Sequence, residues 1–153
     1  MKTFNSKGIE WFLRDENLIE VLGYFSHKDA TRRSHFVVEH AGKKIFIKFF
    51  KEKGVSGLLR NRFLPRGKKE FEMAGRLVSL SIPTPEPLGY GISDKGSYVI
   101  QEWIDGKTFI ETYSSGIRQH KLLSMLADLL NELKQRRIRH NDLHLNNIII
   151  RND

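Results

Sequence analysis

The chain contains no cysteine. It can therefore form no disulfide and no thiolate-ligated metal site, which excludes disulfide-stabilised secreted scaffolds and zinc ribbons. No apolar run approaches the roughly 20 residues of a bilayer-spanning helix, and residues 1–6 hold no apolar segment of signal-peptide length. We therefore expect a cytoplasmic protein, and any contact that it makes with a membrane should be peripheral.

Acidic residues are also in short supply, with 18 Asp and Glu against 26 Lys and Arg, so that the formal net charge is +8. The excess is concentrated in residues 43–76, which contain eleven basic and three acidic side chains. Such a cluster attracts phosphates, anionic lipid or nucleic acid, or it simply keeps the surface solvated. A nucleic-acid partner would depend on this cluster alone, and we do not expect one.

The pattern of apolar residues predicts an α+β protein of two compact lobes, residues 1–104 and 105–153, with the boundary beside Asp105-Gly106. The first lobe should be an antiparallel sheet of about five strands with one helix packed on it, and the second should be mostly one helix. Strands are expected at 18–22, 34–39, 44–50, 98–104 and 148–150, and helices at 68–80 and 117–137. One further strand is expected between the helix at 68–80 and the strand at 98–104, where the prolines keep residues 82–87 extended. Residues 51–69, broken by glycines and a proline, should form a loop with a short helical piece.

Residues 140–147 read His-Asn-Asp-Leu-His-Leu-Asn-Asn and precede three isoleucines. They fit the kinase catalytic-loop pattern H-x-D-L-x-x-x-N, in which the Asp orients the acceptor hydroxyl and takes its proton while the Asn binds magnesium. We therefore assign Asp142 as the catalytic carboxylate and Asn147 as the Mg²⁺ ligand. The four-residue spacing of His140 and His144 also suits zinc on a helix, but the asparagines and the isoleucines favour a loop that enters a strand.

A phosphotransferase also needs a cation at the nucleotide phosphates. Lys48 ends the run Ile-Phe-Ile-Lys, in the last place of the V-A-I-K pattern. Without the other motifs it would be interpreted as a lysine of an edge strand that extends its ammonium into solvent. A helix carboxylate should hold its ammonium. Glu70 is the first choice because it borders the apolar stripe of the predicted helix, and Glu72 is the competitor.

The nucleotide base is expected where the strand at 98–104 enters the inter-lobe linker. Gln101, Glu102 and Ile104 are assigned to it, with Glu102 and its neighbours offering unpaired backbone groups. Phe46, which shares a strand face with Lys48, joins this set. Trp103 is better explained as a core aromatic.

Two parts of an ordinary kinase are missing from the sequence. No G-x-G-x-x-G lies between the first predicted strands, where Lys28, Arg32 and Arg33 would have to meet phosphates with side chains instead. No Asp-Phe-Gly, the second magnesium-binding element, occurs anywhere. We therefore expect a truncated active site, weak ATP binding and very slow turnover, or none, by this chain.

Several segments together resemble the lipopolysaccharide core kinases, a family with a protein-kinase-like fold that phosphorylates heptose or Kdo sugars. The resemblance is carried by residues 45–48, 60–62, 66–71, 82–89 (Ile-Pro-Thr-Pro-Glu-Pro-Leu-Gly), 101–106 and 140–147. It implies ATP and Mg²⁺ as cofactors, a lipid-linked sugar as acceptor, and a peripheral position on the anionic inner-membrane surface. It also implies the roles given above for Lys48, Glu70, Asp142 and Asn147.

Two alternatives stay open. The form D-L-H-x-x-N at residues 142–147 is shared with aminoglycoside and choline kinases, so this loop alone does not choose the acceptor. A chain without the second metal-binding Asp could instead be a non-catalytic nucleotide-binding or interaction module, either a pseudokinase or a fragment.

Overall fold

The computed structural model describes residues 1–25, 34–40, 42–116, 118–138 and 143–151. They form two compact units, Met1–Trp103 and Ile104–Asp153, a division one residue away from the predicted lobe boundary. The mixed α+β class with an antiparallel sheet is confirmed. No helix within the described ranges combines the length and the apolar character needed to cross a membrane.

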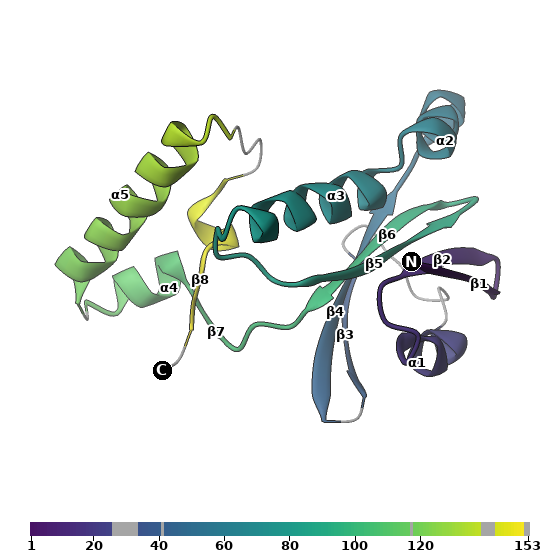
Figure 1. Cartoon of the computed structure of the whole chain (residues 1–153), viewed down its shortest axis with the longest axis horizontal. Helices are drawn as coiled ribbons and strands as arrows, with labels where there is room; N and C mark the ends of the chain where they lie inside the picture. The colour runs from purple at the N-terminus through teal and green to yellow at the C-terminus, as the bar shows by residue number, and fades with distance from the viewer. Residues whose placement is uncertain (26–33, 41, 117, 139–142, 152–153) are drawn as a thin grey trace. The chain divides into compact units, whose positions relative to one another are not determined.

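The first unit is built on a six-stranded antiparallel sheet in the order β1-β2-β5-β6-β4-β3 (Figure 1). The strands are β1 (Lys2–Ser6), β2 (Ile9–Leu13), β3 (Ser34–His40), β4 (Lys43–Lys51), β5 (Pro87–Ser93) and β6 (Gly96–Glu102). The strands expected at 34–39 and 44–50 pair as the β3–β4 hairpin, in which Val37 faces Phe46. β4 in turn pairs with β6, so the strand that carries Lys48 lies inside the sheet.

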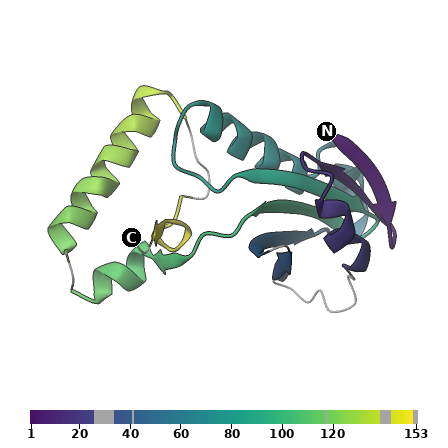
Figure 2. The same ribbon diagram turned by 60° about the horizontal axis from the view of Figure 1, so that its bottom comes forward.

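Helices cover both faces of this sheet, as the turned view in Figure 2 makes clear. They are α1 (Leu18–Tyr24), α2 (Gly54–Phe63) and α3 (Arg66–Ser79). On one face, Leu18 and Leu22 of α1 pack in the main core with Ile45, Ile47 and Trp11. On the other face, α3 places Phe71 against Tyr90 and Val99. The alternation along β4 explains the division, since successive side chains of a strand point to opposite faces.

Three expectations for this unit were wrong. Residues 18–22 are helical rather than extended, because Leu18 and Leu22, four apart, bury one side of a short helix in the core. The helix expected on the sheet, α3, is therefore one of three helices in this unit. A strand was expected between α3 and β6 but was not placed at residues 87–93, because Gly89 and Gly91 give β5 a turn-like composition. These glycines allow close packing, since a Cβ at Gly91 would lie 2.5 Å from the Trp11 ring.

The N-terminal hairpin β1–β2 was also missed. Lys7 and Gly8 turn the chain with positive φ values of 50° and 78°, the geometry of a tight hairpin turn. Ile9, Trp11 and Leu13 then alternate with exposed or half-exposed residues and are buried. That period of two was present in the sequence and would have identified β2.

The second unit contains the long helix and the strand near 148–150 that were predicted, together with elements that were not. Its elements are β7 (Gly106–Thr108), α4 (Phe109–Ser114), α5 (Gln119–Gln135), a 3₁₀ helix (Leu145–Asn147) and β8 (Ile149–Arg151), with β7 and β8 paired antiparallel. Thr108 and Glu111 form a reciprocal capping box at the start of α4. The hydrogen bond that the Thr108 backbone N–H donates to Glu111 holds the pKa of that carboxyl below its usual value.

The start of α3 sits directly on the backbone of β6. The Gly67 N–H donates to the Ser97 hydroxyl at 3.0 Å, and a Cβ at Gly67 would lie 2.1 Å from the Tyr98 carbonyl oxygen. No side chain fits in that space without a backbone shift. Gly67 therefore fixes the distance between α3 and the sheet. It thereby also fixes the distance from the sheet of the residues one helical turn later, such as Glu70.

Two glycine-to-alanine changes within α3 test this contact. We expect Gly67→Ala to lower the free energy of unfolding by about 1–3 kcal/mol, because the methyl group must displace the backbone of β6. Gly75→Ala is the matched control, since its Cβ would meet only the end of the flexible Arg14 side chain, at 3.0 Å. Helix propensity should make it neutral or stabilising by up to about 1 kcal/mol. Equal effects of the two changes in urea unfolding would contradict the close-contact account.

Candidate functional site

Lys48 and Glu70 form an ion pair between the sheet and α3. The Lys48 Nζ lies 3.2 Å from Glu70 Oε1 and 3.3 Å from Oε2. Their side chains keep 38% and 41% of their surface exposed, so solvent and small solutes reach the pair. An ammonium has three donors, and a carboxylate on one side leaves the others able to meet a second anion.

The strand explains why Lys48 points to α3. Phe46, Lys48 and Phe50 share the half-buried face of β4, opposite the buried Ile47 and Phe49. The Lys48 Nζ also lies 4.8 Å from the centre of the Phe50 ring, a cation–π distance that restricts where the ammonium can move. The Lys48 ammonium is thus in contact with an aromatic ring of its own strand and with a carboxylate of α3.

Glu72, the competing carboxylate, pairs elsewhere. Its Oε1 lies 3.8 Å from the Nζ of Lys68, one helical turn earlier on α3. Its side chain is 59% exposed, and this pair lies on the outer surface of the helix. The structure therefore brings together Lys48 and Glu70, the pair that the apolar stripe favoured.

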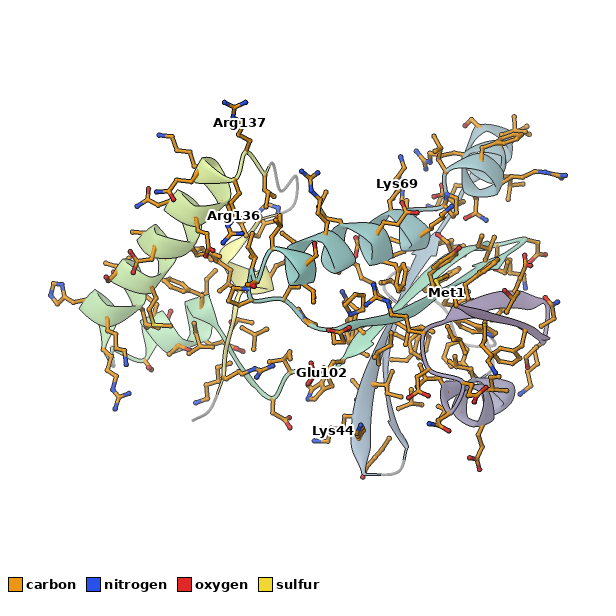
Figure 3. The ribbon with its side chains drawn as sticks, in the orientation of Figure 1. Met1, Lys44, Lys69, Glu102, Arg136 and Arg137 are labelled. Atoms are coloured by element: carbon orange, nitrogen blue, oxygen red, sulfur yellow. The ribbon has the colours of Figure 1, made fainter. Side chains whose placement is uncertain are left out.

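The residues assigned to the base lie at the linker end of the sheet, where Figure 3 labels Lys44 and Glu102. Phe46 is half-buried and opposite Gln101 in the sheet register. Its ring centre lies 5.8 Å from that of His35 and 6.1 Å from that of Trp103, so Trp103 contacts a site residue.

The backbone at this end is more engaged than the sequence predicted. The Glu102 N–H donates to Glu86 O at 2.9 Å, and the Trp103 N–H donates to Lys44 O at 3.2 Å. Sheet pairing thus continues past the end of β6. Neither of these two amides is available to a base without loss of its sheet hydrogen bond.

The residues predicted to form a catalytic loop fall in the second unit. Asn147 ends the 3₁₀ helix with an exposed side chain, and its backbone N–H donates to His144 O at 2.8 Å. Its amide oxygen is a hard donor of the kind that Mg²⁺ takes. Asp142 and His140 lie outside the described residues. Among the residues that are described, no cluster of three or more histidines and carboxylates could hold a metal ion.

Sequence reasoning overlooked two residues that position this region. Gly67 allows the close packing of α3 on the sheet. The only indication of this in the sequence was its position shortly after Pro65, at the expected start of the helix. Glu52, the one acid among residues 51–69, is buried and pairs with Arg60 and Arg66. Gly67 contacts β6, an element distant in the sequence, and hydrophobic periodicity does not reveal such a contact.

The exposure of the Lys48–Glu70 pair predicts a small contribution to stability. Ion pairs that remain this accessible are worth about 0–1 kcal/mol, so Glu70→Gln should lower the free energy of unfolding by no more than that. Glu72→Gln is the control on the same helix and should behave alike. A loss of several kcal/mol for Glu70→Gln alone, measured by urea unfolding, would mean that the pair is primarily structural.

No family model, curated protein or solved structure matches the chain. The functional argument therefore depends on the chemistry and placement of the residues described above. Their strongest feature is a solvent-accessible ammonium held against a helix carboxylate on one face of an antiparallel sheet.

Proposed function

We propose that the chain is the nucleotide-binding part of an ATP-dependent phosphotransferase with a protein-kinase-like fold. The observation that carries the proposal is the Lys48–Glu70 pair, a strand lysine and a helix carboxylate 22 residues apart with 3.2 Å between their charged atoms. Protein kinases use such a lysine to contact the nucleotide phosphates and such a glutamate to hold it. Because a pair this exposed adds little stability, recognition of an anion is the better reason for its presence.

The arrangement of the first unit supports the same fold. One helix, α3, packs across β5 and β6 and reaches β4, the strand that carries the lysine. β6 then leads out of the sheet toward the second unit, as the strand before a kinase linker does. In this proposal the first unit binds the nucleotide, and the second unit begins the lobe that binds the acceptor.

The reaction would transfer the γ-phosphoryl group of ATP to a hydroxyl. The acceptor oxygen forms a bond to phosphorus, the bond from phosphorus to the β,γ-bridging oxygen breaks, and ADP leaves. Asp142 orients the hydroxyl and takes its proton, while Lys48 neutralises phosphate charge. Asn147 would contribute to holding Mg²⁺, which supplies further charge neutralisation when bound. The resemblance to lipopolysaccharide core kinases makes a lipid-linked sugar the proposed acceptor.

Substitution of the lysine tests the nucleotide half of the proposal. Lys48→Ala removes a charge-assisted contact to phosphate and should weaken Mg-ATP binding by about 10- to 100-fold in isothermal titration calorimetry. Lys43→Ala, an exposed lysine at the start of the same strand, should leave the affinity unchanged. Equal affinities of the two variants would sink the assignment of the phosphate site.

Asp142→Asn tests the transfer step on the protein as it occurs in the cell. The change preserves shape and removes the negative charge, so turnover should fall about 10²-fold or more while ATP affinity stays nearly constant. Asp128→Asn, an exposed aspartate on α5, is the control. Full activity of the Asp142 variant would show that the loop is not catalytic. ATP binding without transfer to any sugar would favour the non-catalytic nucleotide-binding module.

A further inference from the structure

The helix α2 points its apolar side chains into solvent. Four of its large hydrophobic residues are among the most exposed of the described chain, and a fifth follows directly after the helix. They are Val55 (76% exposed), Leu58 (47%), Leu59 (54%), Phe63 (73%) and Leu64 (55%). A continuous apolar surface of this kind marks an interaction site.

The polarity of α2 is the reverse of that of an ordinary surface helix. Gly57 and Asn61, four residues apart, form the buried side of α2. Val55, Leu59 and Phe63 recur at the same spacing on the opposite side. A helix that covers a core turns its apolar stripe inward. α2 instead has small and polar residues inside and apolar residues outside.

Polar contacts fix α2 in this orientation. The Glu52 carboxylate, with only 1% of its side chain exposed, pairs with Arg60, and its Oε1 lies 3.4 Å from the Nε of Arg66. The Asn61 Nδ2 donates to the Ser93 carbonyl oxygen at 2.9 Å. Gly57 lets the helix approach, since a Cβ there would lie 3.2 Å from Glu52 Oε2. The apolar side is therefore not needed to hold the helix in place.

Positive charge surrounds this apolar side. Residues 51–69 contain seven basic side chains, and their one acid is the buried Glu52. Within the described part of the chain, no ion pair involves Lys51, Lys53 or Arg62, all of which are exposed. Lys69, labelled in Figure 3, extends from the first turn of α3. The outward surface is thus apolar at its centre and cationic at its edge.

We infer that α2 and its flanking cations bind an anionic lipid surface, with the apolar side chains entering the headgroup boundary. A short helix with Leu and Phe on one side and Lys and Arg beside them is typical of interfacial membrane binding. A second copy of the chain is a poorer partner, because a two-fold contact would bring like charges together. Nucleic acid is also a poorer partner, because its charged phosphates would lie against the apolar leucine and phenylalanine side chains. This surface is separate from the proposed phosphate site and goes beyond the phosphotransferase reaction.

Vesicle sedimentation tests the inference with the unmodified chain and two kinds of vesicle, phosphatidylcholine alone and phosphatidylcholine mixed with phosphatidylglycerol. We expect binding to the mixed vesicles that weakens as salt is added. Leu59→Gln combined with Phe63→Gln should reduce that binding at least about tenfold. Met73→Gln combined with Leu123→Gln, two exposed apolar residues on α3 and α5, is the matched control and should bind like the wild type.

The charges are tested separately by replacing Lys51, Lys53 and Arg62 with Gln. Arg60 and Arg66 are left intact because they pair with Glu52. This variant should bind roughly a hundredfold more weakly at low salt and lose most of the salt dependence. Failure of the wild type to bind mixed vesicles, or equal binding to both kinds of vesicle, would overturn the inference. A lipid-free dimer that the Leu59/Phe63 variant abolishes, seen by light scattering, would assign the surface to self-association instead.

Discussion

The contact between the first turn of α3 and the backbone of β6 is the constraint on which the candidate site depends. The missing side chain of Gly67 allows this contact, and the hydrogen bond that the Gly67 N–H donates to the Ser97 hydroxyl stabilises it. Glu70 follows one turn later on α3, close enough to the sheet for its carboxylate to accept a hydrogen bond from the Lys48 ammonium. A helix held farther from the sheet would leave the lysine on β4 without this carboxylate. The proposed phosphate site is therefore a consequence of one backbone contact.

The sheet divides its two faces between stability and chemistry. One face buries Trp11, Ile47 and Tyr98 completely in the main core, whose apolar contacts dominate the folding energy. The other face keeps Lys48 half-exposed beside a smaller cluster around Phe71. A charged side chain in the middle of a strand is tolerable there because solvent still reaches it. In α2, likewise, buried polar contacts position the helix and its apolar side chains remain exposed.

Much of this fold could be predicted from composition and periodicity. Runs of β-branched and aromatic residues identified β3, β4 and β6, and a period near 3.6 identified α3 and α5 and favoured Glu70 over Glu72. β5 could not be placed, since its glycines serve close contacts with β2, a strand distant in the sequence. The short run at Leu18 fits a strand or a helix equally well until its core partners are known. The engaged amides of Glu102 and Trp103 depend on sheet register, which no local pattern fixes. The position of Asp142 lies outside the described residues.

The central claim is that the Lys48 ammonium meets the phosphates of a nucleotide, and the most direct measurement is covalent labelling by an acyl-phosphate derivative of ATP. Such a probe acylates the lysine nearest the bound phosphates, and mass spectrometry of the peptides identifies it. The account predicts that Lys48 is labelled in preference to the exposed Lys51, Lys53 and Lys69 and that excess ATP suppresses this labelling. Equal labelling of all four lysines, unaffected by ATP, would contradict it.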